Sequence, residues 1–266
     1  MKQMNLLSLN NIYFSYEKKL CDSYLLNDIN ISINCGDFIT ILGPNGSGKT
    51  TLLKLMSGLL HPQKGEVLFN NKKLKSFSRK ETAKKIGYVP QSTLSVFPFS
   101  VYEIVLMGRT PYLGIGGFEE NIDKKKINEA LDLVEISHLK NKGINEVSGG
   151  EAQRAFIARA LVQEPEIILL DEPNAHLDIK HQISIFELFK KFNIEKGIGI
   201  VAVSHDLNLA GNYSRRTVLM KEGQIVRDGI NKDILTSENI NFVFEVNAET
   251  YINNEAVSVH IKSGLN

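Results

Sequence analysis

The eight residues GPNGSGKT, Gly43 to Thr50, constrain the fold of this chain more than any other stretch. They match the pattern G-x-x-x-x-G-K-[ST] in full, between an apolar run at Phe38–Leu42 and a helical pattern at Lys49–Ser57. In this context the glycines turn the backbone so that its N–H groups surround a diphosphate. An ordinary glycine-rich turn before a helix is the alternative, and it carries little weight beside a complete match. The loop therefore predicts a nucleotide-phosphate site in an α/β fold.

Two side chains of this loop are expected to act on the nucleotide directly. Lys49 brings a positive charge to the β- and γ-phosphates, and the Thr50 hydroxyl is a ligand for Mg²⁺. Mg²⁺, with ATP as the substrate, is therefore the predicted cofactor. The expected phosphate-binding residues are Gly43, Pro44, Asn45, Gly46, Ser47, Gly48, Lys49, Thr50 and Thr51.

A second apolar run, IILLDEP, ends in two acids, as expected of a parallel strand that is buried on both faces and carries function at its carboxyl end. Asp171 closes the strand, where it can hold Mg²⁺ directly or through water. Glu172 follows beside the bound phosphates, where a carboxylate orients or deprotonates the attacking water. A solvated loop is the alternative for this pair. It is weaker because the same chain carries a complete phosphate loop.

Three further residues lie where they can reach the same nucleotide. Gln91 follows the short strand that ends at Pro90, and its amide oxygen is expected to reach Mg²⁺ or the water. His205 ends the strand GIGIVAVSH, at the carboxyl end where nucleotide-binding folds carry their function. Tyr16 precedes the phosphate loop and is a candidate to stack on a purine. The alternatives stay open, because strand-end glutamines are usually surface residues and lone histidines are more often structural than catalytic.

The stretch EVSGGEAQRAFIARAL places two glycines at the start of a predicted helix. Ser148 and Glu151 have the spacing of a capping box, and most such pairs are only caps. A cap does not require Gly149 and Gly150, whereas bare backbone at a helix N-terminus lets an anion approach its free N–H groups. If two copies face each other head to tail, this helix start closes over the γ-phosphate bound by the other copy. We therefore expect a homodimer with ATP between its subunits.

The order of strand and helix patterns predicts an α/β protein of the phosphate-loop class, with a mixed sheet and an inserted helical subdomain. Residues 1–91 and 165–230 form the expected core, and residues 92–164 form the helical subdomain. Residues 231–266 are expected to be a C-terminal extension packed on the core. Apart from the helix after the phosphate loop, the first third of the chain reads as strands and turns.

Composition narrows the function further. The net charge of +1 gives no sign of a nucleic-acid partner. Two cysteines, Cys21 and Cys35, form no metal-binding spacing and favour a reducing compartment. No apolar run approaches the ~18 residues of a membrane helix, and the opening MKQMNLLSLN lacks the apolar core of a signal peptide. We expect the chain in the cytosol, with any membrane attachment made through a partner that spans the membrane.

These motifs together resemble the ATP-binding subunits of ABC transporters over nearly the whole chain. The ordered set is Tyr16 as the adenine-stacking aromatic, GPNGSGKT, Gln91, VSGGE, IILLDE, HLD at residues 176–178, and His205. The family usually begins the signature with leucine and ends it with glutamine, whereas this chain has Val147 and Glu151 there. The apolar change is expected to be mild. Glu151 adds a carboxylate near phosphate, which favours its capping role over direct contact with ATP.

The resemblance implies roles for several site residues. Gln91 links the nucleotide site to the helical subdomain, Asp178 crosses the dimer interface, and His205 contacts the γ-phosphate. Two subunits clamp two ATP molecules, closing on ATP and opening after hydrolysis. A pair of integral membrane permease subunits and an extracytoplasmic substrate-binding protein complete the transporter, with the ATPase peripheral on the cytoplasmic face of the membrane.

A narrower resemblance rests on VLMGRTPYLG, residues 105–114, and on HLDIKHQ. Both are similar to the importer ATPases for iron–siderophore complexes, haem and cobalamin, so import of a metal chelate is the expected function. For the first stretch, a loop shaped by Pro111 and Gly114 is the structural alternative.

Other functions stay open beside import of a metal chelate. They are an ABC ATPase for another transported substrate, a soluble ABC ATPase of DNA repair or translation, and a kinase or GTPase. The soluble ABC enzymes usually carry two cassettes or a long coiled-coil insertion, whereas this chain shows one cassette and a short insertion. A kinase or GTPase leaves the motif at Ser148–Glu151 unexplained.

The loops that flank the first helix of the subdomain contain more apolar residues than the surface of a free monomer is expected to expose. These residues are Leu94, Phe97, Phe99, Pro111, Tyr112 and Leu113. We expect this patch, next to Gln91, to receive a short cytoplasmic helix of the permease. The alternative is that the two loops fold back and bury these rings.

Overall fold

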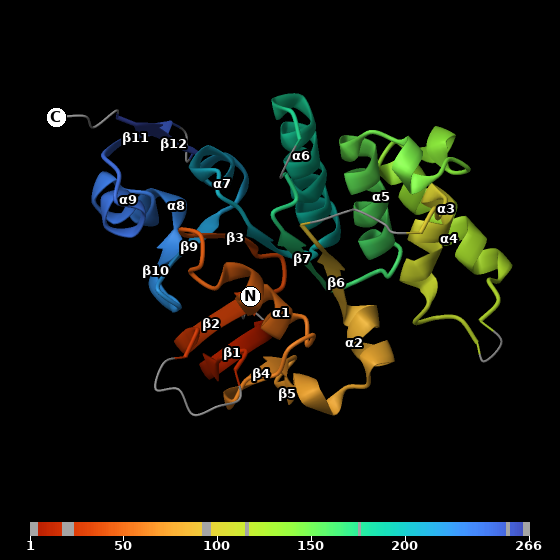
Figure 1. Cartoon of the computed structure of the whole chain (residues 1–266), viewed down its shortest axis with the longest axis horizontal. Coiled ribbons are helices and arrows are strands. Elements are labelled where there is room, and N and C mark those ends of the chain that lie inside the picture. The colour runs from red at the N-terminus through yellow and green to blue at the C-terminus, as the bar shows by residue number, and fades with distance from the viewer. Residues whose placement is uncertain are drawn as a thin grey trace.

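A six-stranded sheet, in the order β10-β9-β3-β8-β7-β6, lies at the centre of the molecule (Figure 1). The computed structural model describes residues 5–17, 24–91, 97–114, 117–174, 177–253 and 256–262. The central strands are β3 (Phe38–Leu42), β6 (Ile86–Val89), β7 (Ile167–Asp171), β8 (Gly199–Val203), β9 (Arg216–Lys221) and β10 (Gln224–Ile230). All are parallel except β10, which pairs antiparallel with β9, so the predicted mixed sheet is confirmed. β3, β7 and β8 are buried along their whole length, which is why their sequences are almost entirely apolar.

A second, antiparallel sheet has the order β2-β1-β4-β5. Its strands are β1 (Asn5–Phe14), β2 (Leu26–Asn34), β4 (Lys64–Phe69) and β5 (Lys72–Lys73). One apolar cluster joins this sheet, the central sheet and α1 (Lys49–Met56), so the helix after the phosphate loop is anchored by core packing. Cys35, just after β2, is exposed and free, and Cys21 lies outside the described residues.

One helix of this part of the chain was not expected from the sequence. After a 3₁₀ turn at Leu74–Ser76, α2 (Arg79–Lys85) begins with a capping box. The Ser78 hydroxyl accepts from the N–H of Glu81 at 3.2 Å, and the Glu81 carboxylate accepts from the N–H of Ser78 at 2.7 Å. The expectation of strands and turns alone is therefore wrong here. α2 buries none of its residues, so its sequence has no apolar residues at helical spacing. The sequence feature that indicates this helix is its capping box.

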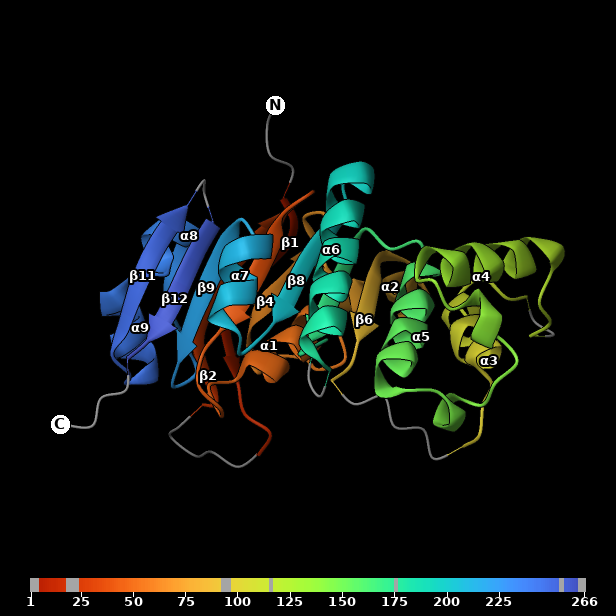
Figure 2. The same ribbon diagram turned by 90° about the horizontal axis from the view of Figure 1, so that it is seen from above.

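The inserted region stands beside the β6 edge of the sheet (Figures 1 and 2). It contains α3 (Val101–Leu106), α4 (Asn121–Leu133) and α5 (Gly149–Leu161), with 3₁₀ turns at Met107–Arg109, Ser137–Leu139 and Ile144–Glu146. Their apolar faces share one cluster with α6 (Ile179–Lys196) and with residues of the central strands. The helical region therefore continues the core of the sheet.

A buried ion pair fixes the loop after α3. Nε of Arg109 lies 2.8 Å from Oδ1 of Asp123, and the two residues are only 4% and 3% exposed. Arg109 also donates to the carbonyl of Val162 at 2.9 Å. The bare Cα of Gly108 allows this approach, because a Cβ there would lie 2.2 Å from the carbonyl oxygen of Arg159. Part of the GRTPYLG stretch therefore has a structural role inside the helical region.

The C-terminal elements lie at the opposite end of the molecule from α3 and α4 (Figure 2). They are α8 (Asn231–Ile234), α9 (Ser237–Phe244), β11 (Ala248–Asn253) and β12 (Ala256–Ile261), and they follow α7 (Leu207–Tyr213) and the β9–β10 hairpin. Their apolar residues cluster with Leu42 of the sheet. The Asn208 amide exchanges two hydrogen bonds, of 3.2 and 2.7 Å, with the backbone of Val259, which joins α7 to β12. Within the described ranges, no helix is long and apolar enough to cross a membrane.

Candidate nucleotide-binding site

Four neighbouring strands bring the predicted site residues to one edge of the central sheet. In the order β3-β8-β7-β6, the phosphate loop follows β3, His205 follows β8, Asp171 ends β7 and Gln91 follows β6. The four strands are parallel, so these residues all lie at carboxyl ends, where open α/β sheets bind ligands. The sequence predicts that each residue ends a strand, whereas the strand order that makes them neighbours comes from the structure.

The phosphate loop is closed by its own lysine. Nζ of Lys49 donates to the carbonyl oxygens of Gly43 and Pro44, at 2.8 and 2.9 Å. Burial lowers the pKa of Lys49, and the carboxylates of Glu172 and Asp171 oppose this shift. The ammonium group therefore already lies inside the loop, where β- and γ-phosphates are expected.

A pocket of about 220 Å³ opens beside this loop. It is lined by Leu25, Asn45, Gly46, Gly48, Lys49, Thr50, Thr51 and Glu172. Gly46 and Gly48 have φ angles of 80° and 95°, the left-handed region that favours glycine. Ser47 does not line the pocket, because its side chain is buried behind Gly43. Most of the predicted phosphate-binding residues thus share one pocket with Glu172.

Thr50 and Asp171 meet although they lie far apart in the sequence. The Thr50 hydroxyl donates to Oδ1 of Asp171 at 2.8 Å. Hydroxyl and carboxylate oxygens suit Mg²⁺, which is usually held by one or two carboxylates together with substrate phosphates. The described residues contain no cluster of three or more His, Cys, Asp or Glu side chains that could hold a metal.

Tyr88, on β6, is a site residue that sequence reasoning missed. Its hydroxyl donates to Oδ2 of Asp171 at 2.8 Å, on the oxygen that Thr50 leaves free. Burial raises the pKa of Tyr88, and the Asp171 carboxylate raises it further, so the hydroxyl stays a donor at neutral pH. The sequence signal was a tyrosine in a short buried strand, because such a hydroxyl needs a partner.

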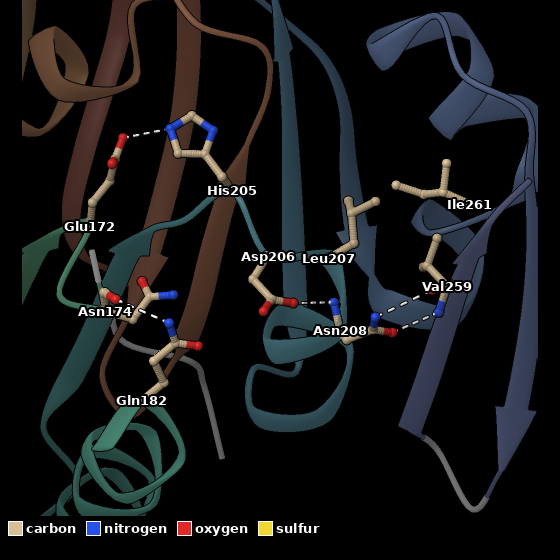
Figure 3. A pocket seen from close by; sticks show the side chains of 9 residues that line it. All are labelled: Glu172, Asn174, Gln182, His205, Asp206, Leu207, Asn208, Val259 and Ile261. Carbon is tan, nitrogen blue, oxygen red and sulfur yellow. Dashed lines mark hydrogen bonds and ion pairs between the residues drawn. The ribbon is translucent and has the colours of Figure 1, made fainter. Parts of the chain in front are cut away.

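Glu172 lies between two of the predicted catalytic side chains. Its Oε2 accepts from the Gln91 amide at 2.7 Å, and its Oε1 lies 2.6 Å from Nε2 of His205 (Figure 3). The backbone of Glu172 has a φ of 49°, an uncommon value for a residue other than glycine. The three residues follow three different strands, and the side chains of Gln91 and His205 both contact the Glu172 carboxylate.

A second pocket, of about 450 Å³, extends from Glu172 and His205 toward the C-terminal hairpin (Figure 3). Its other lining residues are Asn174, Gln182, Asp206, Leu207, Asn208, Val259 and Ile261. The Glu172 carboxylate therefore borders two pockets, the one beside the phosphate loop and this larger one.

Tyr16 lies next to the end of the phosphate loop. Its hydroxyl is 3.2 Å from the Thr51 hydroxyl, and its ring meets the Phe14 ring edge-on with centroids 5.0 Å apart. The residue is 57% exposed. A fixed, exposed ring next to the loop suits stacking on a purine.

The two glycines of the signature have different surroundings. Ser148 caps α5, and the Glu151 carboxylate accepts from its N–H and hydroxyl, both at 2.8 Å. The Ser148 N–H lowers the pKa of Glu151. A Cβ on Gly149 would meet nothing within 4 Å, whereas a Cβ on Gly150 would lie 3.2 Å from the ring of His181. α5 lies apart from α1 (Figures 1 and 2), so this helix start does not reach the phosphate loop of its own chain.

Asp178, the residue expected at the dimer interface, caps the N-terminus of α6. Its Oδ1 accepts from the N–H of His181 at 2.9 Å, and its side chain is 66% exposed. His176, which begins the HLD motif, lies outside the described residues.

The apolar patch flanking α3 is smaller than the sequence predicts. Phe97 is 65% exposed, and its ring lies 5.8 Å from the ring of Phe99, which packs partly on the core. Pro111 is buried, and Tyr112 donates to the carbonyl of Gln163 at 2.7 Å. The second loop therefore folds back, because the Tyr112 ring also stacks on the buried guanidinium of the preceding turn. Leu94 lies outside the described residues.

This fold and site define a phosphate-loop nucleotide hydrolase with a helical insertion. Residues 26–175 match the ABC transporter family. Two similar proteins are the ferric enterobactin transport ATP-binding protein FepC of Escherichia coli and the hemin import ATP-binding protein HmuV of Rhizobium meliloti. FepC is 38% identical over 82% of this chain and 80% of its own, and HmuV is 41% identical over 85% and 87%. The chain belongs to the ATP-binding subunits of ABC transporters, and the predicted family and fold are confirmed.

Solved structures agree with this assignment. An ABC transporter described as metal-chelate type, in an inward-facing conformation, has a chain that matches with a TM-score of 0.82 and 30% identity, over 97% of both chains. The ATP-binding cassette MJ0796, as a dimer bound to ADP and phosphate, matches with a TM-score of 0.75 and 34% identity. That match covers 85% of this chain and 99% of the cassette.

Proposed function

We propose that this chain is the ATP-hydrolysing subunit of an importer that carries a metal chelate, of iron–siderophore, haem or cobalamin type, into the cell. The observation that carries the proposal is the Glu172 carboxylate, held between Gln91 and His205 beside the pocket of the phosphate loop. A carboxylate at that place can take the proton of an attacking water. The relatives named for ferric enterobactin and hemin support the class of transported substrate.

In the proposed reaction, Lys49 and the loop N–H groups bind the β- and γ-phosphates. Thr50 and Asp171, with Gln91 in reach, would hold Mg²⁺, which would supply positive charge against the negative charge that develops on the phosphoryl group. Glu172 accepts a proton from water, whose oxygen bonds the γ-phosphorus while the bond from that phosphorus to the bridging oxygen of ADP breaks. His205 holds this carboxylate and contacts the γ-phosphate, and Tyr16 stacks on the adenine.

The complete site needs a second copy of the chain. Ser148, Gly149 and Gly150 lie at a helix start apart from their own phosphate loop, so they bind the γ-phosphate only in a partner. Gly149 has open space around its Cα, as an approaching phosphate requires. In the same homodimer Asp178 crosses the interface, and Glu151 acts through its cap on Ser148. The related dimeric cassette supports this arrangement.

The homodimer attaches to the cytoplasmic face of the membrane through a pair of permease subunits, and an extracytoplasmic binding protein delivers the substrate to them. Phe97 and Phe99 form the remaining docking patch, close in sequence to Gln91. A permease helix seated there would move with Gln91 when the nucleotide site closes. Residues 231–266 form the extension that packs on the core.

Reconstitution with the permease to which this chain binds tests the proposal. Proteoliposomes are loaded with ATP on the subunit's side, and uptake of ferric siderophore, hemin and cobalamin is measured with the parent and with Glu172→Gln. Uptake of one of these chelates that stops in the variant supports the proposal. Outward transport, or transport only of another class of solute, would contradict it. ATPase activity that DNA or ribosomes stimulate, with no binding to a permease, would identify a soluble enzyme instead.

A further inference from the structure

The imidazole of His181 lies between two segments that the proposed dimer uses at its interface. On one side, Nδ1 of His181 lies 2.7 Å from Oδ1 of Asp178, and the backbone N–H of His181 donates to the same oxygen at 2.9 Å. On the other side, the ring lies against the bare Cα of Gly150, where a Cβ would come within 3.2 Å of it. One side chain of α6 therefore contacts both the aspartate before its own helix and the first turn of α5.

A second contact joins the same two helices one turn further along. Nη2 of Arg154, on α5, donates to the hydroxyl of Ser184, on α6, at 2.9 Å. That hydroxyl in turn donates to the carbonyl oxygen of His181 at 3.0 Å. Nη1 of Arg154 donates to the carbonyl of Val134 at 2.8 Å, which links this contact between α5 and α6 to the end of α4. The position of His181 is thus fixed by its own helix and by the helical region.

The two signature glycines differ in what their bare backbone serves. A Cβ on Gly149 would have no neighbour within 4 Å, so the missing side chain leaves room for something outside this chain. Gly150 is bare toward His181, because a larger residue would press on the ring at its present position. Gly150 therefore has a close contact within its own chain, and Gly149 has none.

We propose that His181 is a positioning residue that holds Gly150 and Asp178 at a fixed separation, so that both present themselves to the partner subunit together. The inference rests on the homodimer of the proposed function. Exposed hydrogen bonds contribute little to the stability of one subunit, and the His181 side chain is 40% exposed. The His181 contacts instead reduce the conformational entropy that is lost when the dimer forms, because both interface segments are already in place before the partner binds.

ATP-driven dimerisation tests this role in a Glu172→Gln background, which slows hydrolysis. Light scattering gives the ATP concentration for half-maximal dimer in that parent, with His181→Ala and with His181→Asn. We expect His181→Ala to raise this concentration about fivefold or more, the lower end of ordinary coupling between two sites. His181→Asn keeps an amide near the place of Nδ1 and is expected to recover part of the loss. Lys191→Ala, an exposed change on the same helix, is the control and is expected to match the parent.

Two measurements on the monomer separate positioning from simple destabilisation. Fluorescent mant-ATP should bind His181→Ala and its parent with the same affinity, since each monomer keeps its own phosphate loop. Hydrogen exchange should become faster in His181→Ala at residues 148–152 and 177–182 but not in β7. Dimerisation of His181→Ala at the parent's ATP concentration, or a loss fully matched by weaker mant-ATP binding, would overturn the inference. Failure of the Glu172→Gln parent itself to dimerise would instead remove the proposed homodimer, and the exchange result would still decide whether His181 links the two segments.

Discussion

The Tyr88 hydroxyl donates a 2.8 Å hydrogen bond to Oδ2 of Asp171, while the Thr50 hydroxyl donates to Oδ1 at the same distance. Both oxygens of the acid are thus held in place by neighbouring side chains. Such supporting contacts orient a metal ligand, and removing one typically costs about 10–100-fold in metal affinity. We therefore expect Tyr88→Phe to weaken binding of Mn²⁺, as a probe for Mg²⁺, by about tenfold in the presence of a non-hydrolysable ATP analogue.

Electron paramagnetic resonance of Mn²⁺ measures this affinity directly. Binding of mant-ATP without metal is the control, and Tyr88→Phe is expected to leave it unchanged. Equal Mn²⁺ affinity in parent and variant would show that Tyr88 does not support the metal site.

Lys49→Ala is expected to weaken ATP binding strongly and leave the fold intact. The ammonium group already lies inside the loop, bonded to the carbonyls of Gly43 and Pro44, where the phosphates are expected. Hydrogen bonds to charged groups contribute about 1.5–3 kcal/mol. Titration with mant-ATP measures the loss, and circular dichroism checks the fold. Near-normal ATP hydrolysis by the purified variant would refute the role of Lys49.

Glu172→Gln keeps the shape of the side chain and removes its negative charge and basicity. We expect hydrolysis to slow by about 10²–10⁴-fold, the usual contribution of a positioned base. Nucleotide binding should survive, so ATP with Mg²⁺ should trap a dimer that is visible by light scattering. His205→Ala provides a comparison, because it removes a partner of the carboxylate at 2.6 Å but leaves the base. A Glu172→Gln protein that stays monomeric with ATP would contradict the dimeric site.

The sequence predicts best those elements whose geometry is set by a short local pattern of residues. The strand at Phe38–Leu42 has the bounds that the sequence predicts, and Lys49 begins the helix after the phosphate loop as expected. Local sequence specifies both elements: an apolar run forms the strand, and the glycines that follow it form the turn before the helix. The placement of Asp171 and Gln91 at strand ends follows from the same kind of signal.

The contacts across the fold could not be read in the same way. Nothing in the sequence says that β6 lies next to β7, which is what places Tyr88 on Asp171. The role of Gly150 depends on a ring that comes from another helix, α6. Tyr112 was expected on the surface. In the structure its ring stacks on the guanidinium of Arg109, and its hydroxyl donates to the carbonyl of Gln163.

The Ser148–Glu151 cap predicts a pH dependence of stability. The Ser148 N–H lowers the pKa of Glu151 below its ordinary value of 4.5 in the folded state. The contribution of this carboxylate is therefore fully present above that value and is lost as the pH falls through the lowered pKa. Glutamine at the same position can also close a capping box but does not titrate. We expect the difference in unfolding free energy between parent and Glu151→Gln, under about 1 kcal/mol at pH 7, to change only below pH 4.5.

Urea unfolding at pH 7 and at several values from 5 to 3 measures this difference. Ser148→Ala, which removes the hydroxyl of the cap, should be destabilised across the whole range, since its loss does not depend on a proton. An equal pH dependence in the parent and in Glu151→Gln would show that other carboxylates account for the effect.

Phe97→Ser is expected to abolish co-purification with the permease while leaving the ATPase activity of the isolated subunit unchanged. Phe97 is 65% exposed beside the Phe99 ring, which makes it the accessible part of the patch. Tyr112 is unsuited to this test, because its hydroxyl bonds the carbonyl of Gln163 and its loss would disturb the fold.

Phe118→Ser is the matched control, since that ring is 83% exposed in the same helical region but does not neighbour Gln91 in the sequence. Pull-down from cells that express both subunits gives the readout. If Phe97→Ser still assembles, or if Phe118→Ser fails equally, the dock lies elsewhere and Gln91 does not transmit its movement through this patch.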